Sequence, residues 1–118
     1  MTIETELGRV EVSPLAVAAI ASAAVLESYG VVGMASKTLR DGLVDRLAHD
    51  GSHRGVDAHV SDGHITVDLY VILEYGVRMS EVARNIMTVV KFRVEKALGM
   101  PVAQVNVHIQ GLRVSVDA

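Results

Sequence analysis

The chain has 118 residues, of which 50% are hydrophobic and 21% are charged, and its formal net charge is −3. This composition predicts one globular domain over residues 1–118 and excludes an intrinsically disordered chain. The absence of cysteine excludes a disulfide framework and a thiolate metal site. Because the chain is slightly acidic and has no cluster of basic residues, we expect no nucleic-acid partner.

The first part of the chain predicts a short strand followed by a helix. Residues 8–12 form the strand, and Ser13 and Pro14 are residue types that commonly begin helices. The helix then runs to Tyr29. Its segment 15–26 is apolar except for one serine, although a helix that lies on a sheet needs only one apolar side.

The middle of the chain predicts an extended segment at 31–35 and a second, shorter helix from Ser36, where apolar residues keep helical spacing. Residues 49–55 then form a loop. Two alternating segments, 56–60 and 65–73, are joined by the turn Ser-Asp-Gly at 61–63, which is typical of a β-hairpin.

A long helix at 79–98 follows, with Ser80 as its N-cap, and a strand begins after Pro101. The apolar positions of this strand change from odd to even numbers at Gly111, which predicts a bulge there. The order β-α-β-(α)-β-β-α-β predicts an α/β (α+β) fold: a small mixed sheet with two long helices packed on it.

The helices carry more apolar residues than one small sheet can cover. Either the first helix is wedged between the sheet and other helices, or another chain covers its outer side. The second alternative defines a candidate partner surface, and the same question arises for apolar residues outside the core stripe of the long helix. This surface consists of Ala19, Ala23, Leu26, Met87, Lys91 and Phe92. It predicts a homodimer or larger oligomer.

No pattern in the sequence indicates catalysis, and we expect neither catalytic residues nor a cofactor. His59, His64 and His108 are interpreted as solvated strand residues rather than as metal ligands, since no thiolate or carboxylate set accompanies them. His49 and His53 flank a glycine that would interrupt any helix aligning them. The G-x-x-G spacing at 30–33 carries two valines where RNA-binding loops carry basic residues.

Three runs of residues, taken in order, are familiar: GVVGMASKTLRDGL, VDLYVILEYGVRMSEVARNI and VNVHIQGLRV. Together they resemble the alkaline shock protein family of Gram-positive envelope stress response proteins, over nearly the whole chain. The chain lacks the long charged tail of several members and is similar to the short housekeeping branch.

The resemblance implies a non-enzymatic structural or adaptor protein of cell-envelope homeostasis and stress response, which acts by protein–protein interaction. Its implied location is cytoplasmic, with membrane association through a membrane-anchor protein and without direct insertion. An alternative implied role is a regulatory or small-ligand-binding subunit of a lipid-metabolic system that contains a fatty acid kinase-like enzyme.

Overall fold

The computed structural model describes residues 2–35, 52–53, 55–61 and 63–114 of the chain. Its helices are α1 (Pro14–Leu26) and α3 (Met79–Leu98). Its strands are β1 (Thr2–Glu4), β2 (Arg9–Glu11), β3 (Val31–Met34), β4 (Ser52–His53), β5 (Val56–Ser61), β6 (His64–Glu74) and β7 (Val102–Arg113). The shorter helix predicted from Ser36 lies outside the described residues.

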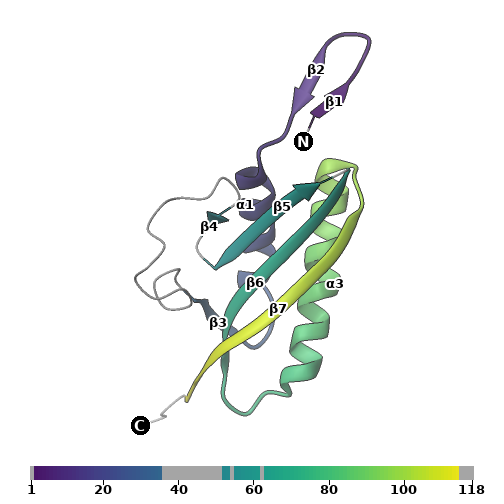
Figure 1. The fold of residues 1–118 in the computed structure, drawn as a ribbon. Coiled ribbons are helices and arrows are strands. Elements are labelled where there is room, and N and C mark those ends of the chain that lie inside the picture. The colour runs from purple at the N-terminus through teal and green to yellow at the C-terminus, as the bar shows by residue number, and fades with distance from the viewer. Residues whose placement is uncertain (1, 36–51, 54, 62, 115–118) are drawn as a thin grey trace.

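Strand β6 is the centre of the main sheet (Figure 1). Along one edge it pairs in parallel with β7. Along the other edge it pairs antiparallel, first with β5 and further on with β3, and β4 extends the sheet beyond β5. Because β6 and β7 run in the same direction, the chain must cross over between them, and α3 makes this crossover.

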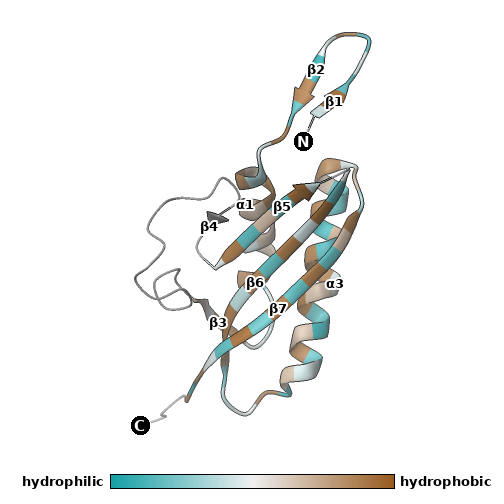
Figure 2. Ribbon diagram, in the orientation of Figure 1, coloured by the Kyte–Doolittle hydropathy of each residue, from teal (hydrophilic) through white to brown (hydrophobic). Residues whose placement is uncertain are grey.

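The core lies between one face of this sheet and the two helices. On β6, Ile65, Val67, Leu69, Val71 and Leu73 are fully buried, and hydrophobic and polar residues alternate along the strand (Figure 2). The helix residues packed on them are small on α1 and larger on α3: Val17, Ala18, Ala21, Ala24 and Val25, and Val82, Ile86, Val90 and Val94. This packing confirms the predicted mixed α+β fold with two helices on a sheet.

The opposite face of the sheet, which we call the open face, is polar. On β6 it presents half-buried residues at the even-numbered positions: Thr66, Asp68, Tyr70, Ile72 and Glu74. The contrast between the two faces of β6 follows from the period of two in a strand, which sends successive side chains to opposite sides.

The helix ends follow local chemistry, with two corrections to the predictions. Ser13 caps α1, since its hydroxyl accepts the Leu15 N–H at 3.1 Å. The helix ends at Leu26 rather than Tyr29. Ser80 is not the N-cap of α3: it lies inside the helix, and the extended residue Arg78 is the N-cap without a side-chain capping bond.

The predicted bulge near Gly111 is confirmed. Ile109 is opposite Val71 on β6, and Gly111 is opposite the next residue, Ile72, so Gln110 is the extra residue of β7. The extra residue resets the alternation of β7, which keeps its apolar positions in register with the core face of β6 on both sides of the bulge.

Two short strands were not predicted. Strand β4 lies within the segment predicted as a loop, where Ser52 and His53 pair with Asp57 and Val56 of β5. Strand β1 pairs antiparallel with β2 to form an N-terminal hairpin, which projects away from the main sheet (Figure 1). The predicted strand at 8–12 is confirmed as β2, whereas its partner β1 was not predicted, although both strands have three residues.

Candidate partner surface

The three α1 residues of the predicted surface are all exposed. Ala19, Ala23 and Leu26 lie on the side of the helix that faces away from the core, and Leu26 is 56% exposed. Leu15 and Ala16 are exposed on the same side. We call these five residues the outer side of α1. Among the described residues, no helix or strand covers this side of α1, and the shorter helix predicted from Ser36 lies outside the described residues.

The outer side of α1 is unusual because it is uncharged. No residue of α1 is acidic or basic, and the fully buried and the exposed positions alike are apolar or small. Water stabilises charged and polar side chains on a helix surface, whereas exposed apolar area gains free energy when another surface covers it. The outer side of α1 therefore has the composition of a contact surface.

The three α3 residues of the predicted surface are also exposed, but they do not form one patch. Met87 and Lys91 are one turn apart and share one side of the helix. Phe92 follows Lys91 by one residue and therefore points about 100° away around the helix axis. It is 62% exposed, and the Lys96 ammonium lies 5.7 Å from the centre of its ring.

An ion pair fixes the side of α3 that faces α1. Arg93 of α3 bonds to the Glu27 carboxylate directly after α1. Phe92 precedes Arg93 by one residue and therefore points about 100° away from the side that faces α1. It is also on a different side of α3 from Met87 and Lys91. Because Lys91 contacts the first residue of β7, we call the side with Arg84, Met87 and Lys91 the β7 side of α3.

Lys91 is engaged in a network that its sequence neighbours did not reveal. Its Nζ donates to the Glu95 carboxylate at 2.7 Å and to the Val102 carbonyl at 3.1 Å. The same carboxylate accepts the Val102 N–H at 2.9 Å. The hydrogen bond from Lys91, and then the one from Val102, lower the pKa of the Glu95 carboxyl. Lys91, which the sequence analysis assigned to the partner surface, thus joins α3 to the start of β7.

The open face carries a polar cluster that the sequence analysis did not identify. Asp68 of β6 accepts from the Asn106 amide at 3.1 Å, and the His108 ring nitrogen lies 3.2 Å from the same oxygen. The His108 ring stacks on Tyr70, with ring centres 4.6 Å apart. These partners are about forty positions apart, so only the parallel register of β6 and β7 would have placed them together.

The three strand histidines are not gathered into one site. His59 lies beside Thr66, whereas His108 lies beside Tyr70, four positions further along β6. Among the described residues there is no group of three His, Asp or Glu side chains that could hold a metal ion. The cluster around Asp68 can fix the polar surface of the sheet by hydrogen bonds, and its histidine is held in one orientation by stacking.

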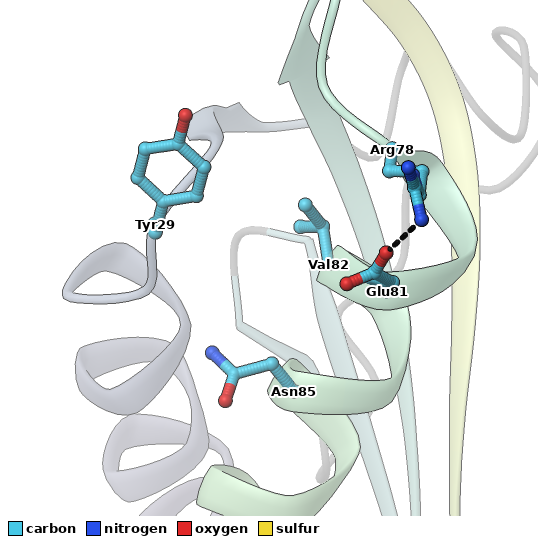
Figure 3. A pocket seen from close by; sticks show the side chains of 5 residues that line it. All are labelled: Tyr29, Arg78, Glu81, Val82 and Asn85. Carbon is cyan, nitrogen blue, oxygen red and sulfur yellow. Dashed lines mark hydrogen bonds and ion pairs between the residues drawn. The ribbon is translucent and has the colours of Figure 1, made fainter.

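Two surface pockets lie near the helix ends. One, of about 240 Å³, is lined by Tyr29, Arg78, Glu81, Val82 and Asn85, between the end of α1 and the start of α3 (Figure 3). The Arg78–Glu81 ion pair, at 2.7 Å, closes one side of it. The other pocket, of about 390 Å³, has a mixed lining. Its described lining residues are Ser22, Leu26, Val32, Gly33, Met34, Ile72 and Arg113.

Residues 2–114 match the model of the alkaline shock protein 23 family, which is described by a cell envelope-related function. The chain belongs to this family. The match includes α1, α3, the main sheet and the N-terminal hairpin, so all the surfaces described above lie within the residues that match the family.

Relatives of similar extent occur in Gram-positive bacteria. The chain is 40% identical over 118 residues to the uncharacterized protein YloU of Bacillus subtilis (strain 168), and the match covers 98% of each chain. It is 38% identical over 113 residues to the uncharacterized protein Spy1614 of Streptococcus pyogenes serotype M6, covering 95% of this chain and 93% of the relative.

Among solved structures, the chain is similar to a zinc form of a variant of the MamM C-terminal domain. The TM-score is 0.47 at 16% identity, over 86% of this chain and 85% of the other. This likeness carries no functional argument. Of the two helices in the described residues, neither combines the length and the apolar character needed to cross a lipid bilayer.

Proposed function

We propose that this member of the family is a non-enzymatic structural or adaptor protein of cell-envelope homeostasis and stress response, which acts by binding other proteins. The observation that carries the proposal is the uncharged outer side of α1. Its exposed alanines, Ala19 and Ala23, allow a partner to approach closely, and Leu26 offers apolar area that is free to be covered.

Phe92 extends this proposal to α3. This residue is 62% exposed, and protein–protein interfaces are enriched in aromatic residues. The Glu27–Arg93 ion pair links the end of α1 to α3 next to Phe92, so a partner that covers Phe92 can also contact residues near α1. The partners we propose are further copies of the chain and a membrane-anchor protein.

The test is capture of partners from native lysate with the tagged protein and with the double variant Ala19→Glu/Ala23→Glu. Burying two carboxylates in an interface would weaken the free energy of binding strongly, whereas two carboxylates on the exposed side of a helix change the free energy of unfolding little. We therefore expect the variant to lose its partners while keeping its fold. His59→Glu, on the exposed open face, is the matched control and should retain them. Equal capture by all three proteins would contradict the proposal.

We also propose that the protein reaches the membrane through a partner rather than by itself. Helix α3 carries four basic and two acidic residues, and two of the basic residues are already ion-paired within the chain. At about 1 kcal/mol for each basic residue near an anionic surface, the remaining charge supports only weak binding. The purified protein should therefore stay in the supernatant when anionic liposomes are sedimented at physiological salt.

A second candidate function, small-ligand binding for a lipid-metabolic system, is supported by the pocket between α1 and β3. Apolar side chains such as Leu26 and Ile72 with the Arg113 guanidinium suit an amphiphile with an anionic end. Calorimetric titration with a medium-chain fatty acid is the test. Saturable binding that Arg113→Ala weakens would favour this function, and the absence of binding would leave the adaptor role.

A further inference from the structure

Among the described strands, β1 and β2 pair only with each other, and the N-terminal hairpin that they form projects away from the main sheet (Figure 1). Leu7 is fully exposed and Val10 is 48% exposed. A two-stranded hairpin with no further packing is only marginally stable in water.

The hairpin nevertheless has a defined turn. The Thr5 hydroxyl donates to the Gly8 carbonyl at 2.9 Å and accepts the Leu7 and Gly8 N–H groups at 3.2 and 3.1 Å. The family match begins at residue 2, so the hairpin belongs to the shared fold rather than to an unrelated extension. A structured, projecting element with exposed apolar residues is suited to docking on another molecule.

The outer edge of β7 is a surface suited to receive it. Within the described residues β7 pairs only with β6, which leaves the backbone groups of its other edge without a strand partner. The segment from Val102 to Gly111 contains no Asp, Glu, Lys or Arg. Charged residues and bulges commonly protect sheet edges against further pairing. This edge lacks charged residues, and its two extra residues, Ala103 and Gln110, leave a regular stretch between them.

The Lys91–Glu95 pair marks where the open edge begins. Both backbone groups of Val102 are bonded to these two side chains, so the edge is closed at Val102 and open from Ala103 onward. Helix α3 runs antiparallel to β7, and Met87 and Arg84 precede Lys91 by one and two turns. They therefore border the open part of the edge. Arg84 has no ion pair among the described residues.

The net charges of the N-terminal hairpin and of α3 indicate which strand the edge of β7 can accept. Residues 2–11 contain three acidic residues and one basic residue, a net charge of −2. Helix α3, with four basic and two acidic residues, has a net charge of +2. Pairing β7 with β7 of a second copy would instead place two α3 helices of net charge +2 on the same face of the joined sheet without an acidic segment between them, which is less favourable.

We propose that the N-terminal hairpin of one copy adds to the outer edge of β7 in a second copy, beside Arg84 and Met87. The backbone of one hairpin strand continues the main sheet. Glu4 and Glu6 then lie near the basic β7 side of α3, and an apolar hairpin residue covers Met87. This inference rests on the proposed function and names a second copy of the chain as one of its partners.

The test uses the absence of cysteine in the natural chain. Single-cysteine variants with Thr2→Cys or Arg9→Cys, one on each hairpin strand, are mixed with variants carrying Ala103→Cys or Gln110→Cys on exposed positions of β7. After mild oxidation, we expect a mixed disulfide for at least one combination, at about tenfold the yield obtained with the exposed control His59→Cys.

Two results would overturn the proposal. One is a yield of mixed disulfide no higher than the control for every combination. The other is that the β7 variants oxidise with themselves as readily as with the hairpin variants, which would indicate β7–β7 pairing. If the mixed disulfide is absent while Ala19→Glu/Ala23→Glu still prevents partner capture, the hairpin contact is wrong and the proposed function stands.

Discussion

Helices α1 and α3 pack on the same face of one sheet, but they differ in what they present to water. Helix α3 has a buried apolar side, with Val82, Ile86 and Val90, and a charged outer side. Helix α1 is apolar or small on both sides. Apart from exposed residues such as Phe92, the fold accounts for the composition of α3, whereas the outer side of α1 has no charged residue that marks it for solvent, and we propose that a second surface covers it.

The first prediction tests the division between the two sides of α3 and has the largest expected effect. Ile86→Ala removes a fully buried side chain and should lower the free energy of unfolding by about 2–5 kcal/mol. The next residue, Met87, is on the exposed side, and Met87→Ala should cost about 0.5 kcal/mol or less in the monomer. Urea unfolding measures both, and equal losses would contradict the assigned sides.

The second prediction applies the same test to α1, where both sides are alanine-rich. Ala21 is fully buried between the sheet and α3, and Ala21→Leu should overpack the core and cost about 1–3 kcal/mol. Ala23→Leu, on the outer side, should change the free energy of unfolding by about 0.5 kcal/mol or less. A large loss for Ala23→Leu would show that the outer side is covered within the chain.

The third prediction concerns the charges of the N-terminal hairpin. Glu4→Lys/Glu6→Lys reverses its charge and should weaken self-association by up to about tenfold, since exposed charge pairs contribute about 0.2–1 kcal/mol each. Adding Arg84→Glu to the same chain should restore much of the affinity. Sedimentation equilibrium at low salt compares the three proteins, and an unchanged dissociation constant would contradict the role of these charges.

The fourth prediction, with the smallest effect, concerns the link between α3 and β7. The pKa of Glu95 is lower in the folded state, so its carboxylate stabilises the fold above the ordinary glutamate pKa of about 4.3. That contribution is lost as the pH falls through the lowered value. Glu95→Gln should therefore be less stable than the natural protein at neutral pH and equally stable at about pH 2–3. If the natural protein were still more stable than Glu95→Gln at about pH 2–3, the ionised carboxylate of Glu95 would not be the cause of its greater stability.

The parts of the fold with a clear period were predictable from sequence. The alternation on β6 matches one buried face, and the change of parity at Gly111 located the bulge of β7. The apolar stripe of α3 matches the core at Val82, Ile86, Val90 and Val94, whereas Met79 and Ala97 at its two ends are exposed. The exposed side of α1 was not decided by its sequence, because a helix that is apolar all round has no side marked for solvent.

Contacts between segments that are distant in the chain could not be predicted from the sequence. The bond from Lys91 to Val102 and the cluster of Asp68 with His108 depend on how α3 and β7 return to β6, which no local pattern encodes. The predicted N-cap of α3 was wrong because Ser80 is a favourable capping residue type, whereas the helix begins at Met79 and its N-cap is Arg78, two residues before Ser80. The loss of one capping bond is small beside the burial of Val82 and Ile86.

The most direct test of self-association through the outer side of α1 and the outer edge of β7 is sedimentation velocity of the purified protein. At about 100 μM, even a micromolar dimer would be well populated. We predict a species larger than the monomer that Ala19→Glu/Ala23→Glu or reversal of the hairpin charges shifts toward the monomer. A natural protein that sediments only as a monomer at this concentration would contradict self-association through these surfaces.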